Sequence, residues 1–203
     1  MERKFINFSS KTIIVVTWAL LVISIIVDSQ NRVFWRAFIW LSFLIISYFS
    51  YFKVKSLSLL TNLMISFAIL TAIFGELYLQ LYYSFEYYDK ILHLFNTILI
   101  FFVFNSFLRK YIPNDSKKRL KYTVIITIFL VFFWELAEII FDYFFDSALV
   151  GVFSKNPTEE LVLGNRMEIL APWLDTLFDL ILNMVGIFIA YLITRESNPK
   201  KSG

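Results

Sequence analysis

Ionisable side chains lie in or beside the long apolar segments of this sequence, where charges are uncommon. The residues of this kind are Asp89, Lys90, His93, Glu135, Glu138, Asp142, Asp175 and Asp179. A charge near the centre of a bilayer costs roughly 2.5–3.5 kcal/mol on insertion scales, so a group of charges indicates a functional site. Carboxylates with one imidazole could hold a divalent metal ion, or act as general acid and base on a bound substrate.

The spacing of these residues favours a shared helix face in each segment. Intervals of three, four or seven residues recur on one side of an α-helix. The three series are Asp89–His93, Glu135–Glu138–Asp142 and Asp175–Asp179–Asn183. We therefore predict three helices that turn their polar faces toward one another.

The amino-acid composition indicates which class of protein contains these ionisable residues. The chain has 203 residues, of which 59% are hydrophobic and only 17% charged, so lipid rather than water must surround much of it. It has no cysteine, which excludes disulfides and thiolate metal sites. The net charge of +3 has a better explanation in membrane topology than in nucleic-acid binding, so no nucleic-acid partner is expected.

Apolar runs long enough to cross a bilayer predict an all-α, polytopic membrane protein with six transmembrane helices in a single transmembrane domain, residues 1–203. The first run lacks a small-residue cleavage pattern, so we interpret it as a retained helix rather than a signal peptide. The six expected helices are at about 12–27, 33–52, 57–81, 91–108, 122–145 and 174–193.

The lysines and arginines orient this bundle. With the N terminus inside, fourteen of the 19 Lys and Arg residues fall on the inner side and five on the outer side. This asymmetry predicts that both termini are cytoplasmic, in a multi-pass protein of the plasma membrane. The ionisable residues of the last three helices then all reach the outer half of the bilayer.

We therefore predict an outward-facing polar pocket. The candidate catalytic residues are Asp89, His93, Glu135, Glu138 and Asp179. The candidate substrate-binding residues are Lys90, Asn183, Arg166, Asp142 and Asp175, with Lys90, Asp142 and Asp175 at the rim. A divalent metal, if one binds, would use His93, Glu135, Glu138 and Asp179.

A long outer connection, residues 146–173, precedes the last helix. Its length makes it a candidate lid or re-entrant element. A short interfacial helix is expected at 158–163, before Gly164. Arg166 could bind an anionic group of a substrate, or be an ordinary exposed arginine.

Three segments resemble landmarks of the VanZ-like and YjdF-like membrane proteins: Tyr88–His93, Trp134–Glu138 and Asp175–Gly186. In that group an Asp-Lys-x-x-His element opens one helix, an acidic element lies in the next, and an Asp-rich element opens the last. The resemblance covers roughly residues 57–193. Glu138 departs from the glutamine usual in VanZ-like members. Because VanZ-like proteins are associated with teicoplanin-type glycopeptide resistance, the resemblance implies a role at the cell envelope.

Three functions remain open from the sequence. The first is binding or processing of a lipid-linked or otherwise amphiphilic envelope substrate, assisted by a metal or by acid–base chemistry. The second is proton-coupled transport, which buried acids and histidine often serve, although no internal repeat or broken helix pair supports it. The third is a structural or partner-binding membrane protein in which the acids only hold the helices together.

Overall fold

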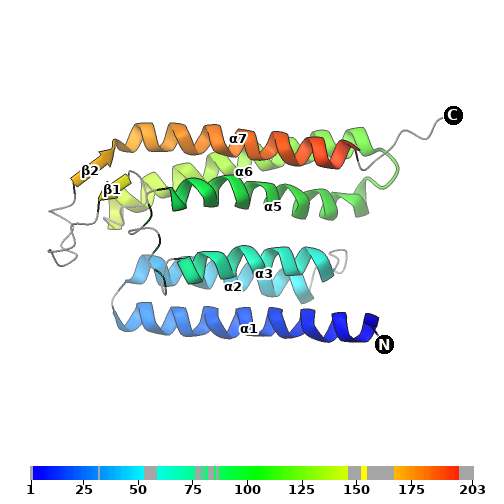
Figure 1. Ribbon diagram of the computed structural model, residues 1–203, viewed down its shortest axis with the longest axis horizontal. Helices are drawn as coiled ribbons and strands as arrows, with labels where there is room; N and C mark the ends of the chain where they lie inside the picture. The colour runs from blue at the N-terminus through cyan, green and yellow to red at the C-terminus, as the bar shows by residue number, and fades with distance from the viewer. Residues whose placement is uncertain are drawn as a thin grey trace. The chain divides into compact units, whose positions relative to one another are not determined.

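A computed structural model describes residues 2–31, 33–52, 59–75, 79, 81, 85, 87–145, 152–154 and 167–196. Within these ranges the chain forms six helices and two short strands (Figure 1). Contacts divide it into two compact units, Met1–Leu79 and Gln80–Gly203. The all-α class is confirmed, whereas a single domain over residues 1–203 stays a prediction.

The first unit contains α1 (Glu2–Gln30), α2 (Phe34–Phe52) and α3 (Leu59–Ile73). Their shared core contains Leu21, Trp40, Ile69 and Ile73. Helix α1 is longer than the predicted 12–27, because residues 2–30 contain neither glycine nor proline to interrupt it. Helix α3 ends at Ile73, before the predicted residue 81, and Phe74 and Gly75 continue it as a wider π-helical turn, in which Leu79 N donates to Phe74 O at 2.9 Å.

A buried ion pair joins the end of α1 to the start of α2. The Asp28 side chain is fully buried, and Arg36 donates to both of its oxygens, from Nε at 2.8 Å and from Nη2 at 2.6 Å. The Trp40 indole donates to the same carboxylate at 2.7 Å. Bidentate contact with arginine and a third donor compensate for removing the carboxylate from water.

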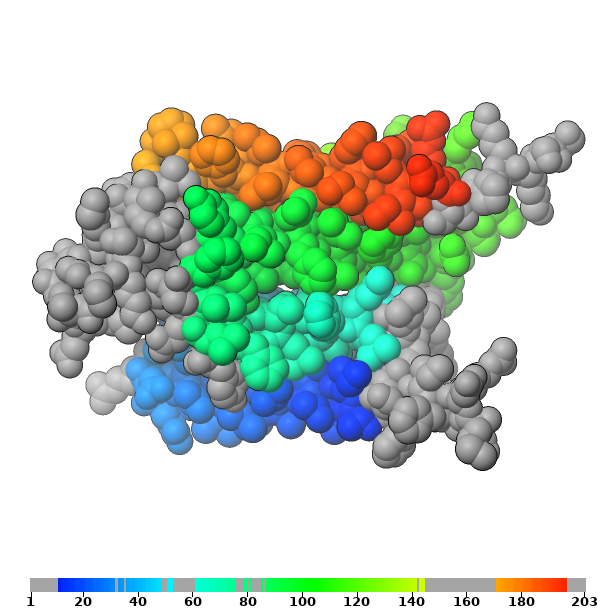
Figure 2. Space-filling view, viewed as in Figure 1, coloured from blue at the N-terminus to red at the C-terminus, as the bar shows by residue number. Residues whose placement is uncertain are grey.

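The second unit contains α5 (Tyr88–Tyr111), α6 (Ser116–Phe145) and α7 (Pro172–Glu196), which lie side by side (Figures 1 and 2). Helices α5 and α7 begin at the end of the bundle where α6 finishes. All three start earlier than predicted. Asp115 caps α6 by accepting a hydrogen bond from Lys118 N at 2.8 Å, and Pro172 is the first residue of α7, where proline is well tolerated.

A two-stranded antiparallel sheet lies in the connection from α6 to α7, where a lid or re-entrant element was predicted. It pairs β1 (Val152–Ser154) with β2 (Met167–Leu170), with Phe153 opposite Glu168. The sheet adds a small β-ribbon to the helical fold. The predicted helix at 158–163 and Arg166 lie outside the described residues.

Four helices are long and apolar enough to cross a membrane among the residues described, at Lys11–Gln30, Tyr88–Tyr111, Ser116–Phe141 and Pro172–Glu196. Helices α2 and α3 contribute shorter apolar stretches, Arg36–Tyr48 and Thr61–Ile73. Large apolar side chains such as Phe132, Phe133 and Phe188 are exposed on the chain. Such surfaces need lipid as their solvent, so the prediction of a helical membrane protein is confirmed, while six spans and the orientation of the termini stay predictions.

Five of the buried hydroxyl groups in these helices donate to their own backbone. Thr17, Ser24, Thr123, Thr127 and Thr194 each donate to the carbonyl four residues earlier, at 2.8–2.9 Å. Each hydroxyl is therefore satisfied within its own helix and requires no partner across the bundle.

Candidate functional site

One face of α5 meets one face of α7. The buried residues of α5 are spaced by four: His93, Thr97, Phe101 and Asn105. The polar buried residues at the start of α7 follow the same interval: Asp175, Asp179 and Asn183. Four residues turn a helix by about 400°, so each series stays on the buried side. The two series begin at the same end of the bundle.

Lys90 lies between the carboxylates of both helices. Its ammonium contacts Asp179 at 2.8 and 2.7 Å, Asp89 at 3.0 Å, and Asp175 as well. We call Lys90, Asp89, Asp175 and Asp179 the lysine group. Lys90 and Asp175 were predicted at the rim of the pocket; Asp175 is 1% exposed, and the Lys90 side chain is 13% exposed. Helix α5 begins at Tyr88 rather than near residue 91, so Lys90 lies in its first turn and reaches α7, while the rim placement stays a prediction.

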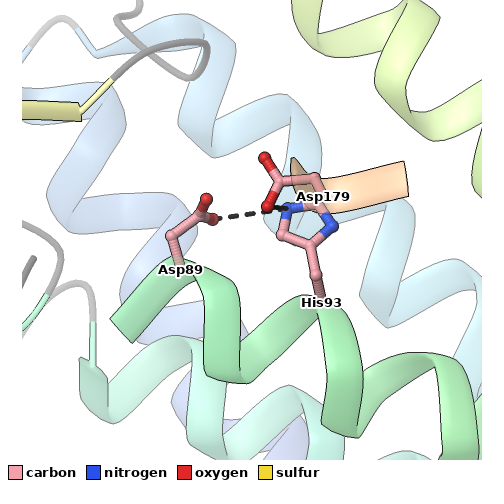
Figure 3. Close-up of side chains that lie close together, drawn as sticks. All are labelled: Asp89, His93 and Asp179. Carbon is pink, nitrogen blue, oxygen red and sulfur yellow. Dashed lines mark ion pairs between the residues drawn. The ribbon is translucent and has the colours of Figure 1, made fainter. Parts of the chain in front are cut away.

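His93 connects this group to α6. Its Nε2 atom lies 3.4 Å from Asp89 Oδ1 and 3.8 Å from Asp179 Oδ1 (Figure 3). Its Nδ1 atom lies 3.3 Å from Glu135 Oε1. The two ring nitrogens thus face carboxylates from three helices, and the ring is itself buried.

Asn183 fixes the orientation of this contact. Thr97 Oγ1 donates to Asn183 Oδ1 at 2.5 Å, which leaves the amide nitrogen to face the acids. That nitrogen donates to Glu135 Oε1 at 3.1 Å and lies 3.3 Å from His93 Nδ1. An amide whose oxygen already accepts a hydrogen bond can present only donors to Glu135 and His93.

Glu138 completes the site on α6 and differs from the other acids. It is 7% exposed and has no hydrogen-bond or ion-pair partner among the described residues. Its carboxylate lies with His93 and Glu135 in a set whose candidate ligand atoms are within 4.8 Å of one another. We call His93, Glu135 and Glu138 the glutamate group. Asp89, His93 and Asp179 form a second set with the same property.

The structure therefore brings together most of the side chains predicted for the pocket. They are Asp89, Lys90, His93, Glu135, Glu138, Asp175, Asp179 and Asn183, and we call them the acid–histidine site. Asp142 lies in α6, but its side chain is outside the described part of the chain, as is Arg166. Whether these residues act on a ligand stays a prediction. The sequence interpretation overlooked the Asp28–Arg36 pair, although an aspartate at the end of an apolar helix was its signal.

Gly186 allows α5 and α7 to approach closely beside the site. A Cβ atom there would lie 2.9 Å from the backbone oxygen of Leu94 and 3.2 Å from Thr97 Cβ. Backbone cannot move aside as a flexible side chain can, so any larger residue must separate the two helices.

Gly186→Ala is therefore expected to lower the free energy of unfolding by about 1–3 kcal/mol, the usual effect of overpacking. Equilibrium unfolding in mixed detergent micelles measures this value. Val185→Ala, on the exposed neighbouring position, is the matched control and should stay within about 0.5–1.5 kcal/mol of the parent. Equal stability of Gly186→Ala and the parent would contradict the close helix approach.

The apolar helices and their buried polar interior define a helical membrane protein. Comparison with known families agrees, because the family described as "Predicted membrane protein (DUF2238)" matches residues 10–197. The chain belongs to this family. Neither a curated protein nor a solved structure matches the chain. The family match does not test the more specific resemblance to VanZ-like and YjdF-like proteins, which stays a prediction.

Proposed function

We propose that the chain is a six-span, VanZ-like or YjdF-like protein of the plasma membrane with cytoplasmic termini. In this proposal the acid–histidine site opens in the outer half of the bilayer and binds the polar group of a lipid-linked or other amphiphilic envelope substrate. The observation that carries it is a cluster of four buried carboxylates and one buried histidine, joined by the partly buried Asp89 and Lys90, between helices whose outward faces are apolar. Such a set is costly in a membrane unless it serves a ligand.

The depth of the site suits the headgroup of an amphiphile. His93 is five residues into α5, or about 8 Å at 1.5 Å per residue. Glu135 is ten residues before the end of α6, or about 15 Å by the same rise. A hydrocarbon core is about 30 Å thick, so the site lies between the membrane surface and the midplane. A substrate anchored in the adjacent leaflet could reach it with its polar end.

The charges select the kind of polar group. Lys90 already contacts three carboxylates, so it does not suit direct binding of a substrate phosphate. The remaining carboxylates favour hydroxyl, amine or amide donors, as in a sugar or peptide headgroup. A phosphate would be held through a bound divalent cation. Binding energy used to position such a headgroup could support acid–base or metal-assisted chemistry.

Retention of lipid on the purified protein tests this proposal. The parent and Asp179→Asn would be extracted in mild detergent from the same host membranes, and their bound lipids identified by native mass spectrometry. We expect one amphiphile class enriched on the parent and reduced at least about tenfold on the variant, which corresponds to 1.4 kcal/mol of binding. Glu196→Gln, exposed at the other end of α7, is the matched control.

The outcomes separate the alternatives. Bulk host lipid on all three proteins would remove the support for an amphiphile site. In that case, proton uptake into proteoliposomes that is lost in Asp179→Asn would favour proton-coupled transport. No uptake, with lower stability of the variant, would favour a structural role for the acids. Thermal unfolding of each preparation controls for misfolding.

A further inference from the structure

The two carboxylates of the glutamate group have no lysine or arginine beside them among the described residues. The ammonium of Lys90 contacts only Asp89, Asp175 and Asp179 among the described residues. No lysine or arginine in the described ranges lies within 4.0 Å of Glu135 or Glu138. Two buried carboxylates beside each other repel strongly at low dielectric, so a proton or a positive ion must lie between them.

The environment of His93 indicates which atom would bind such an ion. Nδ1 lies 3.3 Å from Glu135 Oε1 and 3.3 Å from the Asn183 amide nitrogen, and it can bind an ion in the tautomer that carries its hydrogen on Nε2. Nε2 then carries the hydrogen and faces Asp89 and Asp179. In this tautomer the Nδ1 lone pair and Glu135 Oε1 oppose each other at 3.3 Å, an arrangement that a shared cation would stabilise. Histidine ligands in metal sites commonly donate their other N–H to a carboxylate, and His93 Nε2 lies 3.4 Å from Asp89 Oδ1.

We propose that the chain binds one divalent transition-metal ion through His93 Nδ1, Glu135 and Glu138. The inference rests on the proposed function, because it assigns the ion that would assist at the same site. Glu138 carries it, since this carboxylate is buried, faces His93 and Glu135, and has no other partner among the described residues. Asn183 donates to Glu135 Oε1 at 3.1 Å, and Asp89 Oδ1 lies 3.4 Å from His93 Nε2, so both proposed ligands have a partner that fixes their position.

Only one ion is expected, although two sets of side chains have suitable spacing. In the second set, Asp179 is bound by Lys90 through both oxygens, at 2.8 and 2.7 Å. The ammonium therefore occupies the cation position of the lysine group, and a second metal ion there would be repelled by it. One imidazole and two carboxylates suit Mn²⁺, Fe²⁺, Co²⁺ or Zn²⁺ better than Ca²⁺, which prefers six to eight oxygen ligands.

Pulsed electron paramagnetic resonance with Mn²⁺ tests the ligand set directly. The full chain would be purified in nanodiscs with an affinity tag that lacks histidine, stripped with EDTA and titrated with Mn²⁺. His93 is the only histidine in the sequence, so any imidazole ¹⁴N coupling to bound Mn²⁺ must come from it. We expect one Mn²⁺ per chain with this coupling.

Two amide variants separate direct ligation from a general effect of charge. Glu138→Gln is expected to weaken Mn²⁺ binding at least about tenfold and, with Co²⁺, to change the visible absorption spectrum. Asp175→Asn removes an equal charge from the lysine group, so it can weaken binding but should leave the Co²⁺ spectrum unchanged. Metal-free thermal unfolding checks that both variants fold, which is expected because removing a buried functional charge often stabilises.

Several results would overturn the metal site: no binding of Mn²⁺ or Co²⁺, bound Mn²⁺ without ¹⁴N coupling, two ions per chain, or an unchanged Co²⁺ spectrum in Glu138→Gln. The absence of metal would mean that protons neutralise the glutamate group. Lipid retention is measured separately, so a protein that retains its amphiphile without metal would refute this inference and leave the proposed function standing. A protein that binds metal but retains no amphiphile would support the metal site and contradict the proposed function.

Discussion

Replacing Lys90 by methionine is expected to lower the free energy of unfolding by about 3–5 kcal/mol, the usual effect of removing one partner from a buried ion pair. The side chains of Asp175 and Asp179 are each only 2% exposed, and both contact the Lys90 ammonium. Methionine fills similar space but leaves these carboxylates buried together without their cation. Unfolding in mixed detergent micelles with EDTA measures the loss.

Two further variants define the cause of that loss. Adding Asp175→Asn and Asp179→Asn to Lys90→Met removes the uncompensated charge, so most of the lost stability should return. Lys117→Met, an exposed lysine near the start of α6, should stay within about 0.5 kcal/mol of the parent. If Lys90→Met were as stable as the parent, the lysine group would not hold α5 to α7.

Arg36→Met is expected to have a similar effect in the first unit, about 3–5 kcal/mol, because Asp28 would lose its bidentate partner while fully buried. The remaining hydrogen bond from Trp40 cannot neutralise the carboxylate. The same unfolding experiment measures the change.

The double variant Asp28→Asn/Arg36→Met tests the explanation for that loss. Without the buried charge, its stability should be closer to that of the parent than to Arg36→Met. Equal loss in the single and double variants would show that packing of the Arg36 side chain, rather than its charge, stabilises the joint between α1 and α2.

Spacing in the sequence predicts much of the candidate site. Asp89 and His93 on α5, and Asp179 and Asn183 on α7, lie on the buried faces that an interval of four residues indicates. Asn96 lies three residues after His93 on α5, and its Oδ1 atom is buried. Its Oδ1 atom has no hydrogen-bond partner among the described residues.

Other features depend on contacts that a single sequence does not reveal. The central position of Lys90 follows from where α5 begins and from the reach of a long side chain to α7. The pairing of β1 with β2 joins two short segments on either side of more than ten residues, with no alternating pattern to signal it. The Asp28–Arg36 pair likewise requires a turn between two helices, which residue spacing along one helix cannot predict.

Hydrogen bonds from buried threonine hydroxyls to backbone carbonyls limit how protons reach the acid–histidine site. Thr123 and Thr127 lie on the buried side of α6 on the way to Glu135, but each hydroxyl hydrogen is committed to a carbonyl of its own helix. Buried Val131 follows on α6, and fully buried Phe101 lies on α5. Among the described residues this face offers no continuous relay for proton exchange. Glu135 and Glu138 should therefore exchange protons with water only from the end of the bundle where α5 and α7 begin.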